Sequence, residues 1–429
     1  MKKTVFHMIT GLIAIGLMFG VNFAQAQAGS LDTTFGTGGI VTTSFADGVA
    51  AVGAFEQSNG NIVAVAQVNF VNNAGTGIGL VRYTSAGELD TTFGTNGITV
   101  TTFAGISFDP FGFAVQKNGG ILIGGVATTT SGLNKFGMTR YTSNGVLDTT
   151  FGTNGLVTTK VGIRSDAPSA LLLQPNGQIV MGGFEVAGGN IPGMMSLVRY
   201  NATGTLDTTF GKGGISLASV TFLGPETLAL LSNGDYLGVG QDANGDTGLV
   251  AEFSSKGVLL SKVTSAKVVA ALSSSQSAVP NVMFQSPTIF QPNGRYIVAS
   301  TSCTFHSECR GTRIGVTRFL ETGKTDTTFT AKVESFNPRQ TTSVALAVAL
   351  QANGQIVVGG LITPTSGGLV RLDSNGELDT TFGTVDSFGI CCSVTSNQTF
   401  SALMIQTDGK IVAIGGLDGD LAVARYLAN

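Results

Sequence analysis

The sequence predicts an all-β fold: a seven-bladed β-propeller of four-stranded antiparallel blades, closed by the N-terminal strand completing the last blade. Three observations predict it. One repeat of about 58 residues recurs along the chain, seven Asn-Gly or Asp-Gly turns mark its copies, and the two ends of the chain together make up one repeat. Four antiparallel strands in each repeat are typical of one propeller blade.

The repeat is recognised by a short string that follows its third strand. Leu31-Asp-Thr-Thr-Phe-Gly36 returns at Leu89, Leu147, Leu206 and Leu378, and in a weaker form at Thr325. A degenerate copy with Gly257-Val-Leu259 fills the gap before Thr325. The turns count independently to seven: Asn59-Gly60, Asn118-Gly119, Asn176-Gly177, Asn233-Gly234, Asn293-Gly294, Asn353-Gly354 and Asp408-Gly409. Both counts therefore predict seven repeats.

The sixth copy shows the four strands in order. A continuous apolar run, Val344 to Leu350, precedes the Asn353-Gly354 turn, and Ile356 to Gly360 follows it. This pattern predicts a tight hairpin of inner strands that are buried on both faces. Leu369 to Leu372 supplies the third strand, and a more alternating segment supplies the outer one.

The two ends of the chain predict how the ring closes. The chain stops at Tyr426-Leu-Ala-Asn429, at the point where other copies run on into the motif, and the string resumes with Gly29-Ser-Leu31. We therefore expect the N-terminal strand, within residues 39–45, to pair with the strand that ends near Tyr426, leaving no exposed edge at the seam. A solenoid would instead need separate capping units.

The first 28 residues are typical of a secretory signal peptide. Lys2 and Lys3 precede an apolar run from Ile9 to Val21, and Ala26-Gln27-Ala28 offers a cleavage site, with Ala24-Gln25-Ala26 as the alternative. Residues 29–429 then form a single domain, exported to the periplasm or the cell exterior.

Charge and hydropathy narrow the choice of partners. Acidic residues outnumber basic ones 26 to 23, and no basic run occurs. Nucleic acid is therefore a poor partner. No later apolar run is long enough to cross a bilayer as a helix, so we expect no membrane insertion once the signal is removed. We expect a monomer.

The Leu-Asp-x-Thr-Phe-Gly string, the preceding Asn-Gly turn and the period together resemble the bacterial delta-60 repeat proteins. The resemblance covers nearly all of residues 29–429. It implies an exported, propeller-like β protein, and it implies little about biochemical activity.

The repeated charged residues have a structural interpretation. An aspartate opens the Thr-Thr-Phe turn, where its side chain can bond nearby amides. An arginine occupies one third-strand position in the same six copies. The degenerate fourth copy has Glu252 and Leu260 instead, so both charges are lost together. We hypothesise bidentate, partly buried pairs, in which losing one partner costs more than losing both. The arginines are Arg82, Arg140, Arg199, Arg318, Arg371 and Arg425, and the aspartates are Asp32, Asp90, Asp148, Asp207, Asp326 and Asp379.

The sequence offers no clear catalytic, metal or cofactor site. His306 is the single histidine outside the signal segment, which argues against a His-based metal centre. Asp242-Ala-Asn-Gly-Asp246 resembles a calcium loop, but it lacks glycine at the sixth position and has Phe253 at the twelfth. We interpret it as a turn, with weak Ca²⁺ binding as the alternative.

The four cysteines are irregular features and should be oxidised in an exported protein. Cys303 and Cys309 flank a loop between the second and third strands of blade five. Cys391 and Cys392 are neighbours near the end of the outer strand of blade six. We favour a Cys303–Cys309 disulfide and a vicinal Cys391–Cys392 disulfide, and the two crossed pairings remain open.

These departures from the repeat predict a binding face. Loops after the second and the outer strands emerge on one side of a propeller, where the cysteine sites and the insertion from Ser265 to Pro287 would gather. His306, Glu308 and Arg310 are the candidate binding residues there. We therefore predict a non-enzymatic binding or scaffold propeller that recognises a protein, glycan or small ligand through blades four to six. A hydrolase or lyase of an extracellular polymer, using carboxylates at the channel mouth, is the alternative.

Overall fold

A computed structural model gives the structure of the chain. It describes residues 27–45, 48–70, 75–186, 193–242, 248–265, 288–303, 312–322, 324–329, 344–363, 366–385, 391–395 and 398–428. These residues form strands and turns without any α-helix. Within these ranges there is no helix that is long and apolar enough to cross a lipid bilayer.

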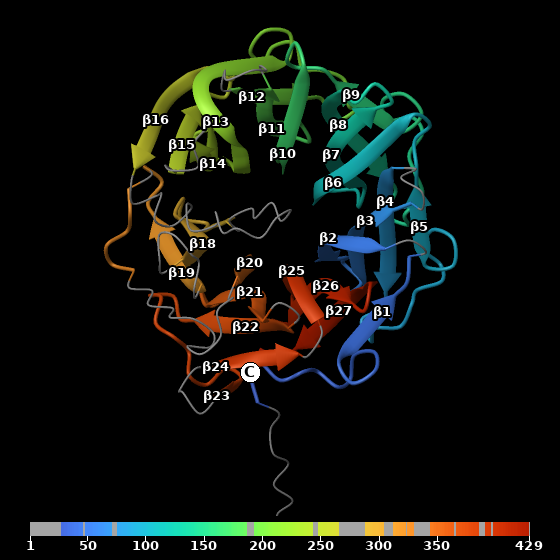
Figure 1. Cartoon of the computed structure of the whole chain (residues 1–429), viewed down its shortest axis with the longest axis vertical. Coiled ribbons are helices and arrows are strands. Elements are labelled where there is room, and N and C mark those ends of the chain that lie inside the picture. The colour runs from blue at the N-terminus through green and yellow to red at the C-terminus, as the bar shows by residue number, and fades with distance from the viewer. Residues whose placement is uncertain are drawn as a thin grey trace, which may run out of the picture.

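The strands are arranged as seven antiparallel blades around a ring, which confirms the predicted seven-bladed β-propeller (Figure 1). Blade one has β2 (Val49–Glu56), β3 (Ile62–Asn69), β4 (Thr76–Tyr83) and β5 (Ile98–Thr101). Blade two has β6 (Ile106–Val115), β7 (Ile121–Thr129), β8 (Asn134–Tyr141) and β9 (Leu156–Thr159). Blade three has β10 (Ser165–Leu173), β11 (Ile179–Val186), β12 (Met194–Tyr200) and the first part of β13 (Ile215–Leu230).

The second half of the ring repeats this order with local departures. Blade four uses the rest of β13 with β14 (Tyr236–Asp242), β15 (Gly248–Phe253) and β16 (Leu259–Ser265), and the described part of blade five has β17 (Thr288–Phe290), β18 (Tyr296–Cys303) and β19 (Thr312–Phe319). Blade six has β20 (Val344–Leu350), β21 (Ile356–Thr363), β22 (Ser366–Leu372), β23 (Thr384–Val385) and β24 (Cys391–Thr395). Blade seven has β25 (Gln398–Ile405), β26 (Ile411–Leu417), β27 (Asp420–Tyr426) and β1 (Ile40–Thr43).

The last blade is completed by the N-terminal strand, as predicted. β1 pairs antiparallel with β27, with Ile40 opposite Ala424 and Thr43 opposite Leu421. Beside the seam, the amide of Gly29 donates to the carbonyl of Leu427 at 2.7 Å. The two ends of the chain are therefore fixed to each other by main-chain hydrogen bonds.

One expectation about the blade interior was wrong in part. The second strands are buried, and Ile356, Val357 and Val358 are fully so. The first strand of the same hairpin, β20, instead alternates between buried and half-buried residues. Figure 1 shows the reason, because β2, β6, β10, β20 and β25 lie nearest the centre of the ring, each at the free inner edge of its sheet.

The cysteines lie at the edges of the described structure. Cys303 ends β18, as expected. Cys391 and Cys392 begin β24 rather than ending the outer strand, because β23 follows the motif and pairs with them, Thr384 opposite Cys392. They thus lie at the end of the strand nearer the Asn-Gly turns, on the side opposite the one predicted. Cys309 lies outside the described residues, and the disulfide pairing stays a prediction.

Candidate functional site

Each repeated arginine connects its own blade to the next one. In blade one, Arg82 Nε donates to Asp90 Oδ2 at 2.9 Å. Its Nη1 donates to the carbonyl of Ser143 at 3.3 Å and to Asn144 Oδ1 at 3.2 Å, both in the turn of blade two. We call this arrangement the interblade clasp, because one guanidinium joins an aspartate of one blade to a turn of the next.

The clasp recurs at six of the seven blade junctions within the described residues. The Nε–Oδ2 distances are 2.8 or 2.9 Å for Arg82–Asp90, Arg140–Asp148, Arg199–Asp207, Arg318–Asp326, Arg371–Asp379 and Arg425–Asp32. The carbonyl acceptors in the following blade are those of Ser143, Ala202, Ser255, Ser374, Ala428 and Ser85, in the same order. At the seam, Arg425 thus holds both Asp32 and blade one.

The contact differs from the bidentate pair expected from sequence. The arginine faces one carboxylate oxygen, Oδ2, while Oδ1 accepts from the threonine two residues further on. In blade three, Thr209 donates to Asp207 Oδ1 through its amide at 3.0 Å and its hydroxyl at 2.7 Å. The Asp-Thr-Thr turn therefore takes one oxygen and leaves the other to the arginine.

These contacts keep the aspartates charged. The hydrogen bond from the Thr328 hydroxyl is the main reason that the pKa of Asp326 is lowered to about 2; burial opposes the shift, and the Thr328 amide and Arg318 add to it. For Asp32, burial is the largest effect and raises the pKa, but hydrogen bonds from Thr34 and the charge of Arg425 outweigh it, so the pKa is lowered. The clasp therefore stays ionised well below neutral pH.

The motif phenylalanine packs between blades. The Arg82 guanidinium carbon lies 4.8 Å from the Phe93 ring centroid, a cation–π contact that the sequence did not disclose. The turn of blade two covers the other side of this ring: a Cβ on Gly145, whose φ is +76°, would lie 2.4 Å from Phe93. Only glycine fits here, because the turn needs a positive φ and a close approach at once.

Blade four lacks the clasp, and neither residue that replaces the arginine and the aspartate is buried. Glu252 Oε2 accepts from the Ser261 hydroxyl at 3.1 Å, and the side chain of Leu260 is 53% exposed. Leu231 stands where six copies have a glutamine at the start of the turn: Gln57, Gln116, Gln174, Gln291, Gln351 and Gln406. The fourth repeat has therefore lost a glutamine as well as the two charges.

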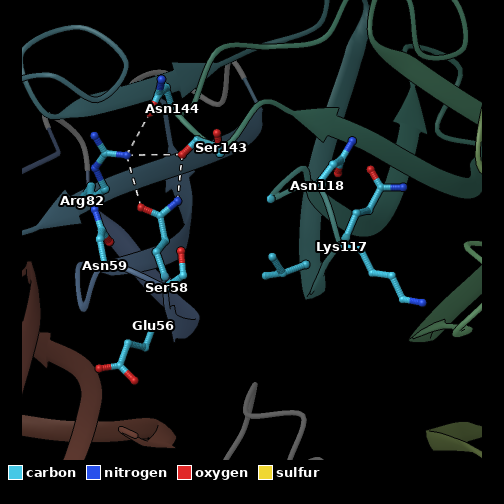
Figure 2. A pocket seen from close by; sticks show the side chains of 12 residues that line it. Glu56, Ser58, Asn59, Arg82, Lys117, Asn118, Ser143 and Asn144 are labelled. Atoms are coloured by element: carbon cyan, nitrogen blue, oxygen red, sulfur yellow. Dashed lines mark hydrogen bonds between the residues drawn. The ribbon is translucent and has the colours of Figure 1, made fainter.

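A polar groove of about 510 Å³ lies between the turns of blades one and two. Figure 2 shows Arg82 hydrogen-bonded to Ser143 and to Asn144 on one wall, with Asn118 and Lys117 on the facing hairpin. The wall is fixed by the clasp and by Gln57, whose Nε2 donates to the Ser143 carbonyl at 2.8 Å. The groove thus has a preorganised hydrogen-bonding wall.

Two non-repeated charges border this groove, which sequence comparison of the repeats had not singled out. Glu56 stands where the other six copies have an apolar residue, and its carboxylate accepts from Gln406 Nε2 at 2.9 Å and from the Thr407 amide at 2.8 Å. Lys117 occupies the second position of its turn and is exposed. Aligning the seven turns would have shown both departures.

Two smaller cavities continue from the same hairpin of blade two. One of about 370 Å³ lies between Lys117 and Pro175 of blade three. The other, of about 310 Å³, is bordered by Gln116, Gly120 and Asp148. All three cavities share Gln116 and Asn118, so the hairpin of blade two separates three neighbouring hollows.

Several sequence-predicted features lie outside the described residues. These are His306, Glu308 and Arg310, the insertion after Ser265, and most of the loop from Asp242 to Asp246. Among the residues that the structure describes, no group of three or more His, Cys, Asp or Glu side chains could hold a metal ion. The predicted binding face of blades four to six therefore stays a prediction, and the hollows described above lie on the Asn-Gly side of blades one to three.

The fold and the recurring clasp define a β-propeller repeat protein. A family model described as a domain of unknown function (DUF5122) beta-propeller matches residues 57–93, 116–151, 174–210 and 351–382. Each matched segment begins at the glutamine that opens the turn and ends at the motif phenylalanine, so it contains one arginine and aspartate of a clasp.

No curated protein matches the sequence at a significant level. Among solved structures, the chain is similar to the β-propeller domain of the Trilobed protease from Pyrococcus furiosus, with a TM-score of 0.44 and 6% identity over 89% of this chain and 94% of that one. It is also similar to Sqt1 from Chaetomium thermophilum, with a TM-score of 0.43 and 10% identity over 90% of this chain and 98% of that one. An ulvan lyase of polysaccharide lyase family PL25 is similar as well, with a TM-score of 0.41 and 10% identity over 91% of this chain and 96% of that one.

Proposed function

We propose that this protein is an exported binding propeller that recognises a hydrophilic ligand through the groove between blades one and two. The observation that carries the proposal is the groove itself: its volume is about 510 Å³, and it is lined by Arg82, Asn59, Asn118 and Lys117 together with Glu56. Ligand sites are concave and use a few well-placed polar groups to fix orientation. A set of donors and acceptors held on strands and on the tight turns between them suits binding.

The rigidity of the groove supports this proposal. Arg82 contacts Asp90 at 2.9 Å, and its side chain is 7% exposed, so ligand binding does not have to order it. The Asn59 and Asn118 side chains are fixed in the same way, because each Oδ1 accepts the amide of the residue two positions later. Preorganised groups lose little conformational entropy on binding, which raises affinity.

The chemistry of the groove favours binding over polymer cleavage. Glycoside hydrolysis ordinarily uses two carboxylates that flank the bond to be cleaved. Of the described residues that line this groove, Glu56 alone carries a carboxylate, and both of its oxygens are taken by the turn of blade seven.

Assignment to the delta-60 repeat proteins is also our proposal, supported by the motif string and its period.

The test is a binding screen of the purified protein on glycan and peptide arrays, followed by titration of each ligand found. Lys117→Glu reverses the free charge of the groove and should weaken binding of a groove ligand about tenfold or more, since each 1.4 kcal/mol changes affinity tenfold. Ala352→Glu is the matched control, because it changes the same turn position in blade six and is likewise exposed. Absence of any ligand, or equal loss in both variants, would reject the groove as the binding site.

A further inference from the structure

Five repeats place a nitrogen donor beside the aspartate of the clasp. The donor belongs to the residue that directly follows the Asn-Gly or Asp-Gly turn. Three of these donors are amides, Asn61, Gln178 and Gln355, whose nitrogens lie 2.9, 2.6 and 2.9 Å from Oδ2 of Asp90, Asp207 and Asp379. Two are cations, Arg295 and Lys410, at 3.2 and 3.3 Å from Oδ2 of Asp326 and Asp32. The aspartate thus regularly accepts a second N–H group besides the arginine.

Blade two has no side chain at this position. Gly120 follows its turn, and in the described structure Asp148 Oδ2 faces Arg140 alone, with Nε at 2.8 Å and Nη2 at 2.7 Å. The side chains of Arg140 and Asp148 are 19% and 24% exposed, against 7% and 8% for Arg199 and Asp207 of blade three. The missing side chain therefore opens the pair to the cavity of about 310 Å³.

The walls of this cavity supply one acceptor that lacks a donor. Gln116 Oε1 is buried and has no hydrogen-bond partner, and the same holds for the equivalent oxygens of Gln291, Gln351 and Gln406. A Cβ on Gly120 would lie 2.7 Å from this oxygen and 3.1 Å from Asn118 Oδ1, so both oxygens border the space that a side chain fills in the other repeats. A buried acceptor without a donor is unfavourable and is ordinarily satisfied by a partner.

We propose that this vacancy, the Gly120 gap, is a binding site for an N–H donor group of a ligand: an amide, ammonium or guanidinium that takes the place of the absent side chain. The inference rests on the proposed function and adds to it, because the gap and the groove share Gln116, Asn118 and Ser143. A ligand in the groove can thus place its nitrogen group against Asp148 and Gln116. Arg140 also faces this cavity, but its charge is balanced by Asp148. Blade five shows that a second cation can lie beside such a pair, because Arg295 contacts Asp326 together with Arg318.

The test uses small probes and two reciprocal variants. Methylguanidinium, methylammonium and acetamide carry N–H donors, whereas tetramethylammonium is a cation without one. Saturation-transfer NMR and crystal soaks of the full chain should show the N–H probes, and not tetramethylammonium, in the gap. Acetamide tests for an amide group of the ligand, whereas methylguanidinium and methylammonium test for a charged group. Gly120→Asn copies Asn61 of blade one and should weaken probe binding about tenfold, as expected for a lost hydrogen bond to a charged group.

The reciprocal variant keeps the result interpretable if Gly120→Asn folds poorly. Asn61→Gly removes the donor to Asp90 and should create a second site for the same probes in blade one. Three results would each overturn the proposal. The N–H probes could fail to bind the wild type, tetramethylammonium could bind equally well, or the N–H probes could bind folded Gly120→Asn as well as the wild type. Probe binding without any array ligand would instead reject the proposed groove function and leave the gap standing.

Discussion

The coupling within one clasp is the sharpest stability prediction, and blade three is the best place to measure it. Arg199 Nε lies 2.8 Å from Asp207 Oδ2, and its Nη1 donates to the Ser255 carbonyl at 2.6 Å and to the Tyr236 hydroxyl at 3.1 Å. Both charged side chains are less than a tenth exposed. We propose the single variants Arg199→Leu and Asp207→Leu together with the double variant.

The two single changes should not cost the same free energy of unfolding. Asp207→Leu leaves a buried guanidinium without a counter-charge, which should cost about 3–5 kcal/mol. Arg199→Leu leaves a carboxylate that still accepts from Gln178 Nε2 at 2.6 Å and from Thr209, so we expect about 2–4 kcal/mol. The double variant replaces the pair by apolar side chains, and its loss should fall short of the sum by about 2 kcal/mol.

Equilibrium unfolding in urea, followed by fluorescence and circular dichroism, should be measured on the wild type, the two single variants and the double variant. The four free energies of unfolding form a double-mutant cycle. The two probes must give one shared transition, because a repeat protein of this size can unfold in steps. Additive losses, or a double variant worse than the sum, would refute the reasoning that the arginine and the aspartate stabilise the fold as a pair.

Two further predictions concern acid and the N-terminus. The folded-state pKa of each clasp aspartate is lowered, so its stabilising contribution is complete above the unfolded pKa of about 3.9 and is lost as pH falls toward about 2, the value for Asp326; the melting temperature should drop across this window, and a flat profile would contradict it. We also predict signal cleavage after Ala26, because the Ala28 carbonyl accepts from Gly383 at 2.6 Å and Ser30 donates to Gln27 at 3.0 Å, contacts that a cut after Ala28 removes. The intact mass of the exported protein should place its first residue at Gln27, and a start at Gly29 would rule this out.

The fold was predictable because the amino-acid sequence repeats one structural unit. Period, turn residues and the matching ends determine blade number and closure without reference to any long-range contact, and β1 pairs with β27 as the ends indicated. The exposure of the first strand in each blade was not predictable from its apolar composition. Val344 to Leu350 appears fully buried as a sequence, and only the geometry of the ring shows that this strand is the free inner edge of its blade.

The site was less predictable, for a physical reason. Sequence comparison found the arginine and the aspartate because they recur and disappear together, but it could not show that the guanidinium also reaches a carbonyl in the next blade, since backbone acceptors carry no residue identity. Gly120 illustrates the opposite case. A glycine after a turn is ordinary in sequence, and its meaning appears only when the cavity and the partly exposed pair of Arg140 and Asp148 are seen beside it.

Because blade four lacks the clasp, the blade junctions of the ring are not all held by the same contacts. The seam between the chain ends is held by Arg425, Asp32 and the carbonyl of Ser85, so the break in the covalent chain is not the weakest point. Between blades four and five the described contacts are apolar, with Tyr296 and Phe319 packed in one cluster with residues of blade four. Apolar packing is not directional and permits small sliding movements that a hydrogen-bonded clasp resists. Within the described residues, six blade junctions are clasped and one is not, so we expect any widening of the ring under strain or on binding a partner to begin between blades four and five.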